Sequence, residues 1–275
     1  MLILYTRAGG DSLPRVIACF KYSIDASELR IDPSTRKPVV EGAKRKTGDI
    51  DKRAIEEAIR VKERTGWTAT GLCVGPQAAR EAAREALAMG LDEVYILSDP
   101  AFEGSDTLAT ARLLAAAARK LGDYKLILCG EMALDGLSAQ VGPRLAELLD
   151  LPQVTYVRKL SVEGEKLTAE RDLEEEYEVV EVELPAVVTV TREINEPRLP
   201  SLRDILRASK KPIVYWGAGD LEVGADVVGE KGSKVKVADV YAPEVKRKGV
   251  IIEEKPAEEA AEELVKYLLQ EGVLR

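Results

Sequence analysis

The 275-residue sequence predicts an α/β fold, with a doubly wound, mostly parallel sheet, an antiparallel strand extension and a C-terminal arm ending in a helix. Three observations predict this fold. First, short apolar runs alternate with segments of helical periodicity between residues 16 and 149. These runs are nearly continuous, which is typical of parallel strands buried on both faces of a Rossmann-like sheet. Second, the strand-like segments after residue 151 are joined by short turns only, as in an antiparallel sheet. Third, a glycine-rich stretch precedes a final amphipathic pattern.

The first half of the chain predicts four core strands, each followed by a loop and then a helix or an excursion. The strands are expected at residues 16–21, 68–74, 93–97 and 126–129. Residues 24–46 are rich in charge and contain two prolines, which indicates a hairpin or an extended excursion. The helices are expected from Asp49 or Asp51, either of which can cap, up to Gly66, from Gln77 to Met89, up to Leu121 and up to Leu149.

The second half predicts an antiparallel meander that finishes in a buried strand. Its segments are residues 154–160, 166–172, 177–184 and 186–191. Ser201 is positioned to cap a short helix that runs through Ala208, and a last strand is expected at residues 213–216. Residues 217–255 read as an extended arm, and Pro256 opens the final helix. That helix packs either on its own core or on a surface outside its domain. The predicted divisions are an N-terminal extension (1–14), an α/β domain (15–215) and the arm with its helix (216–275).

Composition excludes several classes of function. There are 40 basic and 48 acidic residues, and the net charge of −8 argues against nonspecific nucleic-acid binding. The absence of histidine excludes histidine triads and histidine metal ligands within this chain. The three cysteines lie in apolar runs without paired spacing, so we expect buried thiols and no metal site. The acidic residues 174–176 read as a solvated hairpin tip.

The expected location is the cytoplasm. The apolar runs are far shorter than the roughly 20 residues of a membrane span, so no direct membrane insertion is expected. The N-terminus lacks the pattern of a signal peptide. Charged residues make up 32% of the chain and there is a single asparagine, a pattern that fits a thermophile.

Residues 125–143 have the strand, loop and helix pattern of a phosphate-binding junction. An apolar strand ends at Gly130, Gly136 and Ser138 lie in the loop, and helical spacing resumes at Val141. Such a junction directs backbone N–H groups and a helix dipole at an anion, but it also occurs as a plain connection. Ligands of parallel sheets lie beyond the carboxyl ends of the strands. The candidate ligand walls are therefore the loops after Lys21, Val74, Leu97 and Cys129.

Several motifs, in order, resemble the β subunit of electron transfer flavoproteins (ETF). They are Ala-Met-Gly at 88–90, Pro-Gln-Val-Thr at 152–155, the run from Tyr177 to Thr189, Asn-Glu-Pro-Arg at 195–198 and Pro-Ser-Leu at 200–202. The resemblance covers roughly residues 15–215. It implies a heterodimer with an α subunit, which holds most of the electron-transferring FAD, while the β-subunit arm embraces the α subunit. The motifs and the arm argue against a nucleotide-binding protein that acts alone.

The resemblance also implies a second adenine nucleotide in this chain. In ordinary ETFs it is a structural AMP, and the β subunit docks acyl-CoA-type dehydrogenases. In electron-bifurcating ETFs it is FAD, which takes a hydride from NADH. One electron then goes to ferredoxin or flavodoxin, and the other passes through the α-subunit FAD toward a dehydrogenase or a quinone oxidoreductase. Whether the chain has NADH-oxidising enzyme activity therefore depends on which nucleotide it holds.

Two segments resemble the bifurcating branch, namely residues 99–110 and 133–143. Two positions depart from it. Gly48-Asp49 stands where the family usually has Asn-Pro, and Leu137 stands where bifurcating relatives usually carry aspartate. The resemblance favours FAD, with AMP as the alternative.

By this resemblance the site residues fall into three groups, and no catalytic residue or metal ligand is expected. Those expected at the diphosphate are Asp135, Gly136, Ser138, Ala139, Gln140 and Val141. Those expected at the adenosine half are Cys19, Asp51 and Val74, and those at the flavin half are Thr107 and Thr110. Leu202 and Arg198 lie in the loop that resembles the partner-docking loop of ETF.

Overall fold

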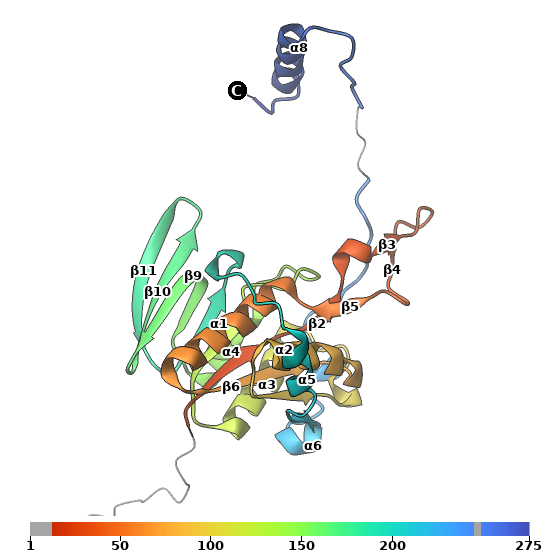
Figure 1. Cartoon of the computed structure of the whole chain (residues 1–275). Helices are drawn as coiled ribbons and strands as arrows, with labels where there is room; N and C mark the ends of the chain where they lie inside the picture. The colour runs from red at the N-terminus through yellow and green to blue at the C-terminus, as the bar shows by residue number, and fades with distance from the viewer. Residues whose placement is uncertain (1–12, 245–248, 275) are drawn as a thin grey trace, which may run out of the picture.

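The computed structural model describes residues 13–244 and 249–274, and its centre is a long twisted sheet (Figure 1). Within the described residues the sheet has nine strands in the order β11-β10-β9-β12-β8-β1-β6-β7-β13. Their bounds, in that order, are Glu176–Glu183, Lys166–Leu173, Gln153–Glu163, Ala186–Val190, Tyr124–Gly130, Arg15–Cys19, Thr68–Val74, Glu93–Leu97 and Ile213–Trp216. The extension expected at residues 1–14 lies outside the described residues, except for its last two.

The six strands from β12 to β13 are parallel, which confirms the predicted sheet class. The chain passes from β1 to β6 and β7 on one side, and then returns to β8 on the other side of β1. The strand order therefore reverses between β1 and β8. In doubly wound sheets ligands bind at this point, beyond the carboxyl ends of the strands.

Helices cover both faces of the parallel part, which explains why its strands are apolar without alternation. One face carries α1 (Asp49–Thr65), α2 (Arg80–Met89) and α5 (Leu202–Ala208), and the other carries α3 (Thr107–Leu121) and α4 (Val141–Leu149). On β1, for example, Val16 and Ala18 pack toward the first group, whereas Ile17 and Cys19 pack toward the second. All four side chains are buried.

The start of α1 differs from the prediction. Its N-cap is Gly48, and no side-chain hydrogen bond caps it, so capping by Asp49 or Asp51 is wrong. The Asp51 carboxylate instead accepts the backbone N–H of Lys21, on the neighbouring strand end. The helix expected at residues 77–89 begins as a 3-10 turn, η2 (Gln77–Ala79), before α2.

Residues 24–46 form the expected hairpin-like excursion. It consists of two antiparallel ribbons, which pair β2 (Tyr22–Ile24) with β5 (Arg45–Thr47) and β3 (Arg30–Ile31) with β4 (Pro38–Val39). A 3-10 turn, η1 (Ala26–Glu28), lies between β2 and β3. The strand extension is partly as predicted, because β9, β10 and β11 form an antiparallel meander and β12 is buried along its whole length. The expectation that β12 continues this meander is wrong, since β12 lies between β9 and β8 and pairs with both in parallel.

The C-terminal region begins with a well-capped helix. Ser201 and Asp204 form a reciprocal capping box on α5, as predicted for Ser201. The arm is not fully extended, because α6 (Ala218–Leu221) and α7 (Gly229–Gly232) form single turns. The final helix α8 (Ala257–Gln270) stands away from the sheet at the end of an extended segment, and none of its residues is buried (Figure 1). None of the helices in the described part is long and apolar enough to cross a membrane.

Two further 3-10 turns follow strands of the main sheet. They are η3 (Pro100–Phe102), after β7, and η4 (Arg192–Ile194), after β12. Both follow the carboxyl ends of sheet strands, so each positions a loop at the same edge of the sheet.

Candidate functional site

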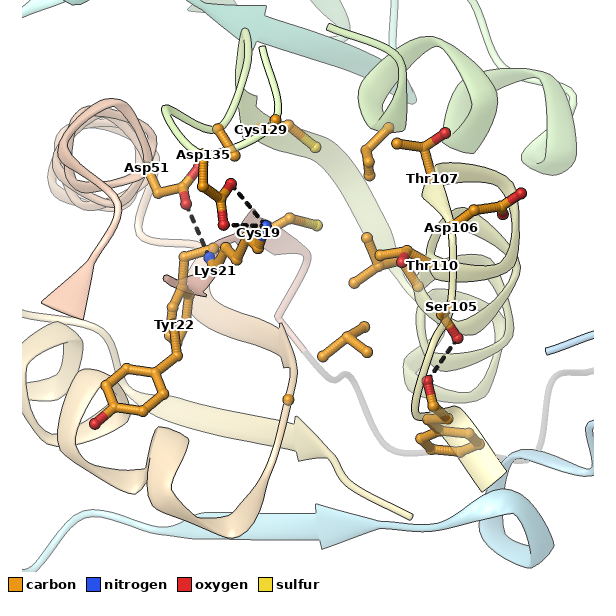
Figure 2. A pocket seen from close by; sticks show the side chains of 18 of the residues that line it. Cys19, Lys21, Tyr22, Asp51, Ser105, Asp106, Thr107, Thr110, Cys129 and Asp135 are labelled. Atoms are coloured by element: carbon orange, nitrogen blue, oxygen red, sulfur yellow. Dashed lines mark hydrogen bonds and ion pairs between the residues drawn. The ribbon is translucent and has the colours of Figure 1, made fainter. Parts of the chain in front are cut away.

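A cavity of about 1000 Å³ opens at the carboxyl ends of β1, β6, β7 and β8, next to the point where the strand order reverses (Figure 2). Its floor includes Cys19, Val74 and Cys129 from the strand ends. Ligand pockets in proteins span about 300–1,000 Å³, so this cavity is at the large end of that range. Its size suits a dinucleotide as well as a mononucleotide.

All eleven residues that the family resemblance assigned to a nucleotide site line this cavity. They are Cys19, Asp51, Val74, Thr107, Thr110, Asp135, Gly136, Ser138, Ala139, Gln140 and Val141. The four loops named as candidate walls also meet here. The geometry brings the predicted set together, while the part of a nucleotide that each residue contacts stays a prediction.

The N-terminus of α4 forms one wall and is open to an anion. Gln140 is its N-cap but makes no capping hydrogen bond, so no side chain occupies the first-turn N–H groups in the way that a serine or aspartate cap would. The dipole of α4 adds a partial positive charge at this end. Gly142 lets the helix approach the sheet, because a Cβ there would lie 2.3 Å from Cγ2 of Thr189 on β12.

The second wall is the N-terminus of α3 with the loop before it. Asp106 caps α3 by accepting the N–H groups of Leu108 and Ala109. Thr107 and Thr110 lie beyond this cap and line the cavity (Figure 2). The Thr107 hydroxyl lies 3.0 Å from Oε1 of Gln140, so a hydrogen bond joins the two walls.

Lys21 is a site residue that the sequence reasoning missed. Its Nζ lies 2.8 and 2.7 Å from the two carboxylate oxygens of Asp135, and it faces the cavity (Figure 2). The available signal was a lysine directly after the first parallel strand, at the sheet edge where ligands bind. Among the described residues that line the cavity, only Lys21 and Arg45 are basic. The cavity therefore carries few cations for a ligand with phosphates.

Asp51 is a buried carboxyl group held between two glycines. A Cβ at Gly48 would lie 2.5 Å from its Oδ2, and a Cβ at Gly130 would lie 2.6 Å from its Oδ1. Burial raises the pKa of Asp51 from 3.8 to about 7, against the opposing effects of the Lys21 backbone N–H and the Lys21 charge. Asp51 is therefore near the midpoint of its titration at neutral pH.

The three cysteines are buried thiols, as predicted. Cys19 and Cys129 are partners in the register of β1 and β8. A hydrogen bond with Cys129, together with burial, raises the pKa of Cys19 well above its usual value. Burial also raises the pKa of Cys73 to about 12. Cys19 and Cys73 are therefore protonated at neutral pH, and Cys19 and Cys129 contribute an apolar, polarisable floor to the cavity.

The loop with Asn195, Arg198 and Leu202 lies outside this cavity and is anchored on α1. The Asn195 amide donates to the carbonyl of Arg53 at 3.0 Å. The Arg198 guanidinium pairs with Glu56 at 2.8 Å and with Glu63 at 2.6 Å. Beyond these anchors the loop carries exposed apolar residues, because Leu199 is 95% and Leu202 is 73% exposed. Asn195 and Arg198 thus hold the loop on α1, and the exposed Leu199 and Leu202 form its apolar tip.

Comparison with known proteins gives a consistent set of matches. Residues 38–221 match the family model described as the electron transfer flavoprotein domain. The chain is 45% identical, over 94% of its length and 99% of the relative, to the electron transfer flavoprotein subunit beta of Thermoanaerobacterium thermosaccharolyticum. It is 37% identical, over 94% of its length and 100% of the relative, to the caffeyl-CoA reductase-Etf complex subunit CarD of Acetobacterium woodii. It is also 36% identical, over 82% of its length and 86% of the relative, to the acryloyl-CoA reductase electron transfer subunit gamma of Anaerotignum propionicum.

Proposed function

Because the chain belongs to the electron transfer flavoprotein family, as a β-subunit member, we propose that its cavity holds FAD and that the chain works in electron bifurcation from NADH. Membership in this family implies an α-subunit partner. The observation that carries the proposal is the extent of the cavity, about 1000 Å³ between two helix N-termini. An AMP would occupy the α4 side and leave the α3 wall without a ligand.

The residues present fit FAD in three regions. The open N-terminus of α4, with Ser138 and Lys21, supplies N–H, hydroxyl and ammonium donors for the diphosphate. Asp51, Cys19 and Val74 enclose the adenosine half, while Thr107, Thr110 and Phe102 offer an apolar slot with two hydroxyl groups for the flavin half.

In this proposal the cofactor carries the chemistry and the protein chain binds and positions it. When bound, FAD supplies the acceptance of two electrons from NADH and their release one at a time. The chain contributes binding, orientation and exclusion of water. Ferredoxin or flavodoxin is the proposed low-potential acceptor. For the second electron we propose a dehydrogenase of the acyl-CoA type or a quinone oxidoreductase, since two similar chains are named for caffeyl-CoA and acryloyl-CoA reductases. The proposed location is the cytoplasm.

One observation favours the alternative, in which the chain holds AMP and serves as a scaffold. Leu137, at the position where the resemblance expects aspartate, is exposed, does not line the cavity and offers no hydrogen bond to the ligand. In that case the chain would position the α-subunit FAD and dock dehydrogenases without handling electrons itself.

The test is the nucleotide content of the heterodimer. We expect the full chain, copurified with its α subunit, to carry two FAD per heterodimer and to show flavin bleaching on addition of NADH. Absorbance spectra and chromatography of the released nucleotides measure both quantities. One FAD together with one AMP in the denatured supernatant, and no bleaching by NADH, would establish the scaffold function instead.

A second prediction concerns the apolar tip at Leu199 and Leu202. Leu202→Glu is expected to slow electron exchange with the partner dehydrogenase by at least about 30-fold, because exposed apolar anchors of this kind contribute roughly 2 kcal/mol or more to docking. Flavin content should not change, since the loop lies outside the cavity. Stopped-flow reduction of the dehydrogenase flavin measures the rate.

The matched control is Val179→Glu, which places the same charge at an exposed apolar residue of β11. Equal rates for the two variants would show that Leu202 is not the docking residue. A lower flavin content in Leu202→Glu would point to disturbed folding instead.

A further inference from the structure

The first part of the C-terminal arm packs against a wall of the cavity. We call residues 217–235 the arm root. The backbone N–H of Ala218 donates to the Asp99 carboxylate at 3.0 Å, and that of Glu230 donates to the carbonyl of Glu103 at 2.8 Å. The N–H of Gly229 donates to the Ser105 hydroxyl at 2.9 Å. The arm root is thus bonded along the loop that leads from β7 to α3.

The arm root follows the shape of this loop closely. Gly229 has φ +63°, and a Cβ at this position would lie 2.1 Å from the carbonyl oxygen of Ala101. The preceding residue, Val228, is fully buried in the same apolar cluster as Phe102. Only glycine permits both this backbone conformation and this approach. The contact is therefore a built part of the fold.

Ser233 and Asp106 connect the arm root to α3. The Ser233 hydroxyl accepts the N–H of Asp106 at 2.8 Å. It lies 2.7 Å from the carbonyl oxygens of both Gly104 and Gly229, which share its single proton. One Asp106 oxygen caps α3, and the other accepts the N–H groups of Lys234 and Val235 at 2.7 and 3.1 Å. A single carboxylate thereby joins the arm to the helix end that carries Thr107 and Thr110.

The two walls of the cavity differ in this support. The side-chain hydrogen bonds of residues 133–143 in the described chain run to Lys21 and Thr107, not to the arm root. Ser233 itself does not line the cavity. A change at Ser233 therefore acts directly on the α3 wall, whereas the α4 wall is linked to it through the single exposed hydrogen bond between Thr107 and Gln140.

We propose that Ser233 is a positioning residue for the flavin half of FAD, because it holds the loop before α3 in place from outside the cavity. The inference rests on the proposed function, since it takes FAD as the ligand and the α3 wall as its flavin side. It predicts a difference between two ligands. FAD uses both walls, whereas AMP uses only the α4 wall, so Ser233 supports binding of FAD and not of AMP.

The experiment compares FAD and AMP binding to the heterodimer of the full chain with its α subunit, after removal of the nucleotide from the β-subunit site. Ser233→Ala is expected to weaken FAD binding about tenfold, because it removes a hydroxyl that serves as both donor and acceptor. AMP binding should change less than about twofold, within the error of such comparisons. Ser233→Thr, which keeps the hydroxyl, should restore FAD binding. Titration calorimetry with each nucleotide gives the affinities.

Hydrogen exchange provides a second readout that does not need a ligand. Backbone amides of residues 104–110 should exchange faster in Ser233→Ala, while those of residues 138–145 keep their wild-type rates. The matched control is Asp239→Asn, which removes a different arm contact, the 3.0 Å ion pair with Lys37 on the hairpin excursion. This variant should leave FAD binding and both exchange regions unchanged.

Three outcomes would overturn the inference. Equal losses of FAD and AMP affinity in Ser233→Ala would mean a general loss of structure. Unchanged exchange at residues 104–110 would mean that the arm root does not hold the wall. If the wild-type heterodimer takes up AMP but no second FAD, the proposed function fails first, and that failure is visible before any variant is compared.

Discussion

Arg198→Ala is expected to lower the free energy of unfolding by about 2–3 kcal/mol, even though Arg198 lies on a surface loop. Its guanidinium makes bonds to both oxygens of Glu56 and of Glu63, and its backbone N–H also donates to Glu56. Glu56 is only 2% exposed. Loss of one partner of a buried ion pair leaves a poorly compensated charge, which costs about 3–5 kcal/mol when the pair is fully buried. The expected cost is smaller because Arg60 still bonds Glu56 at 2.8 Å.

The pH dependence of this loss has a definite sign. Burial acts to raise the pKa of Glu56, but hydrogen bonds from Arg198 and Arg60 outweigh it, so the pKa lies below the ordinary value of 4.5. A lowered carboxyl pKa contributes stability above the unfolded-state pKa, and this contribution disappears as the pH falls. Urea denaturation should therefore show a full difference at pH 7 that shrinks below about pH 4.5.

The control for Arg198→Ala is Arg203→Ala, which removes an exposed arginine from neighbouring α5. It should change stability by less than about 0.5 kcal/mol. If Arg198→Ala is as stable as this control and only slows electron transfer to a dehydrogenase, then Arg198 serves docking rather than the anchoring of the loop.

Asp51→Asn is expected to make the nucleotide-free chain more stable relative to wild type as the pH rises. In the folded wild type Asp51 has a pKa of about 7, against 3.8 ordinarily, so the folded state keeps a proton that the unfolded state has lost. Wild-type stability should fall between these two pH values by at most about 1.4 kcal/mol per pH unit, and then level off. Asparagine removes this titration. The gain of the variant between pH 5 and pH 8 is expected to be on the order of 2 kcal/mol.

Denaturation midpoints at pH 5, 6, 7 and 8 measure this gain. The matched control is Asp49→Asn, in the same turn of α1 but with a half-exposed side chain. A gain that is the same at all four pH values would show that Asp51 does not titrate in this range. In that case Asp51 would be ionised at all four pH values, and the site would carry its full negative charge at neutral pH.

Much of the fold could be predicted because its determinants are local. The strands buried on both faces, the Ser201 cap and the Pro256 helix start all depend on residues close in sequence. The eleven cavity residues came from the family resemblance, and parallel topology explains why they meet at one edge of the sheet. The cap of α1 was wrongly predicted because Asp51 bonds Lys21, which is 30 residues away in sequence. Lys21 and Ser233 were missed for the same reason, since their partners are distant in the chain.

The separation of α8 from the sheet has a consequence for how a partner is held. The arm is last held to the α/β domain at Ala242, whose N–H donates to the carbonyl of Arg36 at 2.8 Å. Residues 243–256 lie between this contact and α8, and a chain of that length spans at most about 50 Å. A partner that contacts both the α/β domain and α8 is bound at two points joined by this tether. Once one point is engaged, the other binds as an intramolecular event at a high effective concentration. Either contact can then open and close again before the partner is lost.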